Sequence, residues 1–279
     1  MMDVTRDVLV VVGSGGLGRA IAAELGPGRT TLLADIDPDT LEVTSLELAD
    51  QGLDVVTRTV DIGETGAVRR LAAEAAGLGP VRHLVHTAGV MPGQADIDTI
   101  LRVDLAGPAR VLEEFGPVIQ PGGSAVVVAG MAAYLGLDRV TPDQGIALGL
   151  VPADELLEMS CTHPSMFASP LRAYGFAKHA NVLRVQATAT AWRERGVRVN
   201  SVSPGIVATP VTHQELIGEH GAYLRKLAEN SPVGRVGTVR EVTRAIEFLL
   251  DPRSSYITGT DLLVDGGVTA TLQMEGSPA

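Results

Sequence analysis

The sequence predicts an α/β fold with a doubly wound, mostly parallel sheet, and three observations predict it. Seven short runs are apolar at nearly every position, as strands buried on both faces of a sheet are. Helical segments of ten or more residues alternate with these runs. A glycine-rich turn joins the first run to the first helical segment. Together they predict about seven strands with helices on both faces of the sheet.

The predicted elements follow one another without a break that would mark a second domain. The seven apolar runs read DVLVVVG, RTTLLAD, LDVVTRTVD, VRHLVHTAG, GSAVVVAG, VRVNSVSPG and DLLVDGG. Segments such as LGRAIAAEL and ILRVDLAGPARVLEEF are predicted helices between them, and a long helix is predicted from about Leu171 to Arg195. We therefore predict a single Rossmann-type domain over residues 1–279.

Composition and charge exclude several classes of protein. The net charge is −11 and there is no basic stripe, which argues against nucleic acid or an anionic membrane surface as a partner. The single cysteine, Cys161, cannot form an intrachain disulfide, which favours a reducing cytoplasm. The apolar runs are too short to span a membrane, the N-terminus lacks a signal-peptide pattern, and no histidine–carboxylate cluster has metal-site spacing. We expect a cytoplasmic protein without a metal.

One segment interrupts the alternation of strands and helices. Residues 131–170 contain no strong strand pattern, and loop-forming stretches surround one short helix predicted in PADELLEMS. Long irregular stretches in compact domains are commonly lids or binding loops, and the apolar content of this one argues against disorder. We interpret it as an insertion that forms a substrate lid. An oligomer contact and a plain surface insertion are the alternatives.

The turn after the first run has the spacing of a dinucleotide-binding site. Its glycines form a G-x-G-x-x-G pattern that follows a predicted strand and opens a predicted helix. Glycine permits a tight turn and close approach of the backbone to a pyrophosphate, which the helix N-terminus attracts. The predicted cofactor-binding residues of this turn are Gly13, Ser14, Gly15, Gly16, Leu17 and Gly18.

An acidic residue at the end of the second run predicts which dinucleotide binds. Asp35 follows Gly18 by 17 residues, near the position at which an acidic side chain binds the adenosine ribose hydroxyls. Asp35, Asp37 and Asp39 would repel a 2′-phosphate, and no arginine or lysine follows closely to neutralise one. We therefore predict NAD rather than NADP. Asp37, just before Pro38, fits better as the cap of the next helix.

A tyrosine and a lysine supply the candidate chemistry. Tyr174 and Lys178 are four residues apart and therefore fall on one face of the long predicted helix. Lys178 is one of two lysines among 22 basic residues. A neighbouring ammonium favours the phenolate form of tyrosine, and a tyrosine tuned in this way exchanges a proton with an alcohol or carbonyl group. The same spacing also arises by chance, so a structural role stays open on this pattern alone.

These features together resemble the short-chain dehydrogenase/reductase family over nearly the whole chain, from about Asp7 to Val268. The matching pieces are the glycine turn, Asp35, VDI, TAG, VDLAG, GGSAVVV, the Tyr174–Lys178 pair, RVNSVSPGIVATP and ITGTDLLVDGG. The resemblance implies that Tyr174 is the catalytic acid/base and that Lys178 binds the nicotinamide ribose and lowers the tyrosine pKa. It implies further cofactor contacts at Ile36, Asp61, Ile62, Thr87, Ala88, Gly89, Pro204, Gly205, Val207 and Thr209.

The chain departs from the family's pattern at catalytic positions. The usual serine is Gly130, which removes a hydroxyl that would polarise the substrate oxygen, and the usual asparagine is Asp104. The usual NNAG reads HTAG, beginning at His86, and the glycine turn is one residue shorter than in the commonest subgroup. Asp104 would hold Lys178 protonated or join a proton relay. Candidate replacements for the serine hydroxyl are Tyr134, Thr141, Ser160 and Thr162, or a group on the substrate itself.

We predict an NAD(H)-dependent oxidoreductase that interconverts a secondary alcohol and a ketone, with Tyr174, Lys178, Asp104 and Gly130 at its catalytic centre. The aliphatic content of the insertion indicates a bulky, mostly apolar substrate. Because members of the family are usually tetramers or dimers, the resemblance implies a homotetramer or homodimer. The alternative is an NAD-binding regulatory or structural protein that has lost catalysis with the serine hydroxyl.

Overall fold

A seven-stranded parallel sheet forms the centre of the computed structural model, which describes residues 6–136, 140–218 and 221–275. The strand order is β3-β2-β1-β4-β5-β6-β9, and every neighbouring pair is parallel. The predicted doubly wound fold is thereby confirmed. The strands are β1 (Val8–Val12), β2 (Thr30–Asp35), β3 (Asp54–Thr59), β4 (Val81–His86), β5 (Ile119–Val128), β6 (Arg198–Pro204) and β9 (Asp261–Val264).

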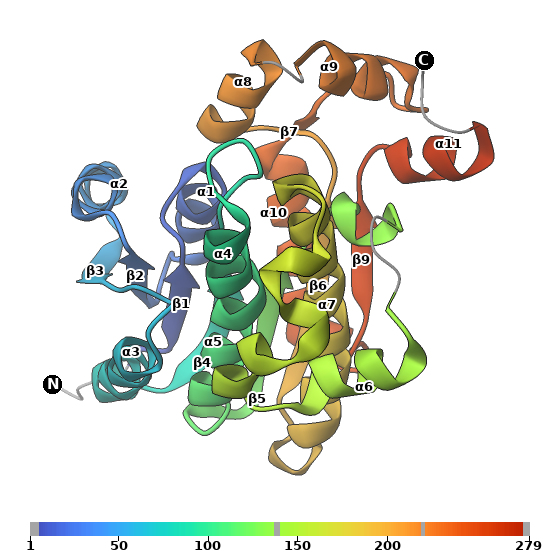
Figure 1. The fold of residues 1–279 in the computed structure, drawn as a ribbon. Coiled ribbons are helices and arrows are strands. Elements are labelled where there is room, and N and C mark those ends of the chain that lie inside the picture. Colours follow the sequence, from blue (N-terminus) through green and yellow to red (C-terminus); the bar gives the residue numbers. More distant parts are fainter. Residues whose placement is uncertain (1–5, 137–139, 219–220, 276–279) are drawn as a thin grey trace, which may run out of the picture.

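Helices cover both faces of the sheet (Figure 1). One face packs against α1 (Gly16–Leu25), α2 (Pro38–Asp50) and α10 (Val239–Leu250). The other packs against α3 (Thr65–Leu78), α5 (Gly107–Phe115) and α7 (Pro170–Ala191). The strand order reverses between β1 and β4, and ligands of such sheets bind beyond the carboxyl ends of the strands at this point.

The remaining elements lie around this core. The long helix predicted over residues 100–115 is continuous, but it contains a π-helical turn, η1 (Leu101–Ala106), between α4 (Ile97–Ile100) and α5. A two-stranded sheet of β7 (Val207–Ala208) and β8 (Gly237–Thr238) flanks α8 (Pro210–Ile217) and α9 (Gly221–Asn230), and α11 (Val268–Glu275) follows β9. None of the helices within the described ranges is long and apolar enough to cross a membrane.

The insertion is helical, but its main helix is not where the sequence predicted it. Residues 137–139 of it lie outside the described part. The remainder forms η2 (Met131–Tyr134), α6 (Pro142–Leu150), η3 (Ala153–Glu158), η4 (Ser160–Thr162) and η5 (Pro164–Met166). The stretch PADELLEMS contains 3-10 turns, whereas α6 begins at Pro142. A capping box explains this start, because Thr141 and Gln144 satisfy each other's backbone N–H groups.

The middle of the insertion packs on the outer side of the core. Leu148, Leu156 and Phe167 join a hydrophobic cluster with α7. Arg184 of α7 donates to the carbonyl of Val151 at 2.5 Å and forms an ion pair with Glu113 of α5. The helix α6 packs on a later part of α7, where its Gly145 and Gly149 lie against Leu183 and Ala187. Tyr174 packs against the same cluster, and the lid interpretation of residues 131–170 stays a prediction.

Candidate active site

The glycine turn connects β1 to α1 in a conformation that side chains would block. Gly13 has φ +100°, and a Cβ there would lie 2.5 Å from the backbone nitrogen of Ala88. A Cβ on Gly18 would lie 1.8 Å from the carbonyl oxygen of Gly13. Thr87 donates to that same carbonyl oxygen at 3.0 Å. The turn therefore packs directly on the segment after β4, and its predicted approach to a pyrophosphate stays a prediction.

Asp35 lies at the end of β2, beside this turn. Its carboxylate accepts hydrogen bonds from the backbone N–H of Ser14 at 2.6 Å and from the Ser14 hydroxyl at 3.0 Å. These bonds place a negative charge next to the glycines. The predicted cap is confirmed, because Asp37 accepts from the backbone N–H of Asp39 at the start of α2.

The space around the turn fits a dinucleotide. A Cβ on Gly15 would meet nothing within 4 Å, and no side chain caps the start of α1. Opposite the turn, Gly16 faces Thr209 and Pro210, which begin α8. The uncapped N-terminus of α1 and the glycines beside it could bind a pyrophosphate. The carboxylate of Asp35, one strand away, could bind a ribose.

The other predicted cofactor residues differ in the solvent exposure of their side chains and in their contacts. The side chain of Ile36 is largely exposed, whereas Ile62 is 5% exposed and packs against Gly107 in the core. Asp61 accepts from the backbone N–H of Gly63 and forms an ion pair with Arg102 at 2.9 Å. Arg102 is a neighbour that the sequence reasoning missed. After β6, Gly205 packs against Asp265, and Val207 is buried.

Tyr174, Lys178 and Asp104 come together between α7 and η1. The Lys178 ammonium lies 5.2 Å from the centre of the Tyr174 ring and 3.2 Å from Oδ1 of Asp104. Asp104 is fully buried, and its carboxylate also accepts from the backbone N–H of Val90 at 3.3 Å. A Cβ on Gly89 would lie 2.4 Å from Asp104, so the glycine leaves room for the carboxylate.

The charges in this cluster shift the pKa of Tyr174 in opposite directions. Burial raises the pKa of Tyr174, the Lys178 ammonium lowers it, and the carboxylates of Asp104 and Glu215 raise it further. The net direction is upward, unlike the lowering expected from Lys178 alone, because burial and Asp104 offset the lysine. Burial lowers the pKa of Lys178, but the charges of Asp104 and Tyr174 raise it above its usual value. Lys178 is therefore a firmly held cation.

Position 130 lies directly against the tyrosine hydroxyl. A Cβ on Gly130 would be 3.8 Å from Oη of Tyr174, an ordinary van der Waals contact. Its φ of 160° is extended backbone that any residue adopts. A serine would therefore fit here and would direct its hydroxyl toward the reacting atoms.

Three of the candidate replacements for the serine hydroxyl already have a hydrogen-bond partner. Tyr134 donates to Asp261 at 2.5 Å, and Thr162 donates to the carbonyl of Leu156 at 2.7 Å. Thr141 caps α6, and Ser160 is exposed on the insertion. These bonds compete with a role at the substrate for Tyr134, Thr141 and Thr162, and all the candidates stay predictions. The tyrosine hydroxyl itself donates to the sulfur of Met91 at 3.7 Å.

Comparison with known proteins identifies the family. Residues 6–142 match the family described as short chain dehydrogenase, and residues 152–269 match the one described as enoyl-(acyl carrier protein) reductase. The short-chain dehydrogenase/reductase bsc3 of Alternaria brassicicola is 35% identical over 98% of this chain and 99% of its own. The chain belongs to the short-chain dehydrogenase/reductase family. Members of this family are oxidoreductases that act on alcohols and ketones with a nicotinamide dinucleotide.

Two further relatives show the breadth of the short-chain dehydrogenases. Galactitol 2-dehydrogenase (L-tagatose-forming) of Cereibacter sphaeroides is 33% identical over 93% of this chain and 93% of its own. A crystal structure of a variant of actinorhodin polyketide ketoreductase with NADPH superimposes with a TM-score of 0.74. It is 24% identical and covers 95% of this chain and 97% of its own. This similarity shows the fold.

Proposed function

We propose that this short-chain dehydrogenase/reductase is an NAD(H)-dependent enzyme that interconverts a secondary alcohol and a ketone, with Tyr174 as the acid/base. The observation that carries the proposal is the contact of Tyr174, Lys178 and Asp104 in one buried cluster. A structural role for the tyrosine would require neither a buried ammonium beside its ring nor a buried carboxylate behind that ammonium.

Each residue of the cluster has a separate role in proton transfer. When bound, the nicotinamide supplies or accepts the hydride. Tyr174 takes the hydroxyl proton during alcohol oxidation and returns it during ketone reduction. Lys178 stabilises the phenolate by its charge, and its ammonium can also donate to a ribose hydroxyl. Asp104 holds Lys178 protonated and in place through the 3.2 Å contact.

The preference for NAD rests on Asp35. Its carboxylate is fixed beside the glycine turn by Ser14, where a 2′-phosphate would meet a like charge. A solved structure with the same fold is named with NADPH, so the fold by itself does not exclude that phosphate. The charge at the end of β2 is therefore the feature that selects NAD in this proposal.

The substrate that we propose is bulky and mostly apolar. Met91 contacts the Tyr174 hydroxyl, Met131 follows Gly130, and Leu171, half exposed, lies one helical turn before Tyr174. Met131 belongs to one end of the insertion, and Leu171 directly follows the other. Polyols are the competing class, because galactitol 2-dehydrogenase is a relative.

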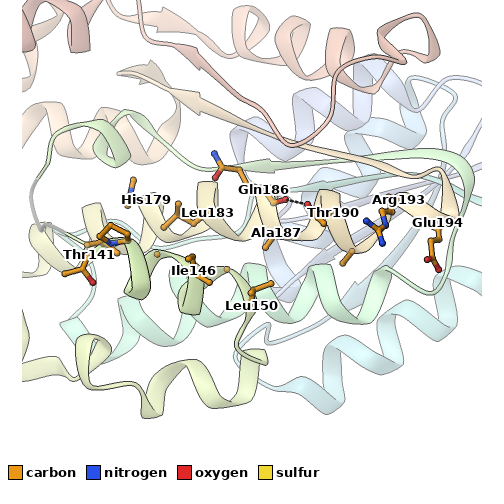
Figure 2. A pocket seen from close by; sticks show the side chains of 15 residues that line it. Thr141, Ile146, Leu150, His179, Leu183, Gln186, Ala187, Thr190, Arg193 and Glu194 are labelled. Atoms are coloured by element: carbon orange, nitrogen blue, oxygen red, sulfur yellow. Dashed lines mark hydrogen bonds between the residues drawn. The ribbon is translucent and has the colours of Figure 1, made fainter.

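We also propose that the chain forms a homodimer or homotetramer. An open groove runs between α6 and the later turns of α7 (Figure 2), and Ile146 and Leu150 border it with most of their surface exposed. Exposed apolar side chains of this kind are covered in many oligomers. Light scattering of the purified chain measures the state directly, and a monomer at micromolar concentration would contradict the proposal.

Loss of catalysis is the second candidate function, and Gly130 is the observation that favours it. Removing one donor to a developing oxyanion costs about 3–4 kcal/mol, or about 10²–10³ in rate. The raised pKa of Tyr174 acts in the same direction. In this case the chain would bind NAD(H) in a regulatory or structural role.

One experiment separates the two candidates. NADH formation and consumption are measured with a panel of bulky apolar alcohols, their ketones and polyols, and NADH binding is measured by fluorescence titration. Activity that falls about 10³-fold or more in Tyr174→Phe while NADH binding stays within about twofold supports the enzyme. Unaltered activity in that variant would contradict the role of Tyr174. Tight NADH binding without turnover of any substrate supports the binding protein.

A further inference from the structure

A row of polar side chains crosses the sheet beneath α7. His86 of β4 pairs in register with Val127 of β5, Val127 with Ser201 of β6, and Ser201 with Asp261 of β9. Residues paired in register on parallel strands direct their side chains to the same face of the sheet. Val127 belongs to the core between the sheet and α3, α5 and α7, so the whole row lies on that face.

Several atoms of this layer have no hydrogen-bond partner among the described residues. His86 is 1% exposed, and both of its ring nitrogens are unpartnered. The hydroxyl of Ser201, Oδ1 of Asp261 and the amide nitrogen of Asn181, on α7, are likewise buried and unpartnered. Buried polar groups in proteins nearly always have a partner, and where protein atoms do not supply one, ordered water does. Because these atoms share one face of the sheet beneath α7, ordered waters are the partners expected for them.

The layer lies near Lys178 of the catalytic cluster, on the face of the sheet that α7 covers. Asn181 follows Lys178 by three residues, so the two side chains lie on one stripe of α7. The Lys178 charge also reaches His86. Burial and this charge lower the pKa of His86 to about 3, so the imidazole is neutral and offers one donor and one acceptor. The charged groups that face the layer are Lys178 from α7, Asp104 from η1, through its ion pair with Lys178, and Asp261 from β9.

We propose that His86, Asn181 and Ser201 hold a cluster of buried waters that solvates the Lys178–Asp104 ion pair from beneath, and that His86 is thereby a positioning residue for the reaction of Tyr174. The catalytic part of this inference rests on the proposed function, whereas the water site does not. Waters under the pair lower the cost of keeping both ions buried, and they hold Lys178 at the height of the tyrosine ring.

Removing the waters from this layer should raise the pKa of Tyr174. Without the waters, the environment of the ion pair is less polar, and desolvation disfavours every charged form. The phenolate of Tyr174 then forms at higher pH. In His86→Leu, we expect the pH–rate profile of alcohol oxidation to move to higher pH and the rate at neutral pH to fall about tenfold, below the range for direct acid–base groups. His86→Gln, which keeps a donor and an acceptor, should restore most of the profile.

The first test is a high-resolution crystal structure of the full chain with NADH and of its His86→Leu variant. We expect ordered waters bonded to the His86 ring, to the Asn181 amide and to the Ser201 hydroxyl, and fewer of them in the variant. A dry layer, in which these side chains bond to each other, would overturn the proposal. This readout needs no substrate, so waters in a chain that turns over nothing would leave the site standing and reject the proposed function alone.

The second test compares melting temperature, NADH affinity and pH–rate profile in His86→Leu, His86→Gln and Thr31→Val. The Thr31 hydroxyl is also buried and unpartnered, but Thr31 lies on the opposite face of the sheet, so its variant controls for removal of any such atom. We expect the profile to move only in His86→Leu, with NADH affinity within about twofold. A higher melting temperature with an unmoved profile in His86→Leu would show an ordinary core histidine and overturn the proposal.

Discussion

The glycine turn and the catalytic cluster differ in which atoms are packed together. At the turn, backbone meets backbone, and a Cβ on Gly13 or Gly18 would lie within 2.5 Å of a neighbouring backbone atom. At the cluster, side chains meet side chains, and Asp104, Gly130 and His86 all depart from the family's usual residues. Steric contacts allow only glycine at these positions of the turn. In the buried catalytic cluster, several combinations of polar residues can make the required hydrogen bonds.

The largest effect that we expect comes from restoring the missing hydroxyl. Gly130→Ser should raise the rate of alcohol oxidation about 10²–10³-fold, because the added hydroxyl lies beside Oη of Tyr174 and can donate to the substrate oxygen. Gly130→Ala fills the same space without a donor and is the matched control. Equal rates in the two variants would show that position 130 acts by volume and not by hydrogen bonding.

The rigidity of the turn predicts the next effect. Gly18→Ala places a methyl group 1.8 Å from the carbonyl oxygen of Gly13, so the turn must open, and NADH binding should weaken about 100-fold. Gly77→Ala in α3, where a Cβ meets nothing within 4 Å, should leave binding unchanged. Fluorescence titration of both variants checks this. Retained affinity in Gly18→Ala would mean that the turn is softer than its contacts indicate.

A smaller effect is expected at the end of β2. Asp35→Ala removes the charge that opposes a 2′-phosphate and a partner of the ribose hydroxyls, so the preference for NAD over NADP should fall about 10- to 100-fold. The control is Asp37→Ala, which removes the cap of α2 at a cost of about 1 kcal/mol in stability and should leave the preference unaltered. The ratio of kcat/KM values with the two cofactors is the measurement.

The last effect concerns stability in acid and not activity. Burial and the Lys178 charge lower the pKa of His86 to about 3, and burial lowers that of His83 to about 4, whereas unfolded histidine titrates near ~6.5. Below that pH the unfolded chain binds protons that the folded chain does not, so the free energy of unfolding falls as pH falls. Fully buried His86 should contribute about 1.4 kcal/mol per pH unit, down to about pH 3.

Denaturant titrations from pH 7 to pH 4 measure this dependence. His86→Leu should have a shallower slope than the parent, because one of the two buried neutral histidines is gone. Identical slopes would show that His86 titrates alike in the folded and the unfolded chain and would contradict its lowered pKa.

Most of the strands and helices could be predicted from the sequence, because local patterns determine them. The apolar runs predict strands buried on both faces, the glycine spacing predicts the turn at β1, and Asp37 before Pro38 predicts the cap of α2. The pairing of Tyr174 with Lys178 follows from helical spacing alone. The start of α6 was missed, although the Thr141–Gln144 capping box is readable in the sequence.

What the tertiary structure alone decided is which polar groups share a buried space. The ion pair of Lys178 with Asp104 joins residues 74 positions apart, and together with burial it reverses the net shift expected for the Tyr174 pKa. The register of three strands aligns His86 with Ser201, and Asn181 lies on α7, which packs on that face of the sheet. Local patterns determine a residue's conformation and face, but the electrostatic environment depends on neighbours that only the assembled sheet and helices bring within reach.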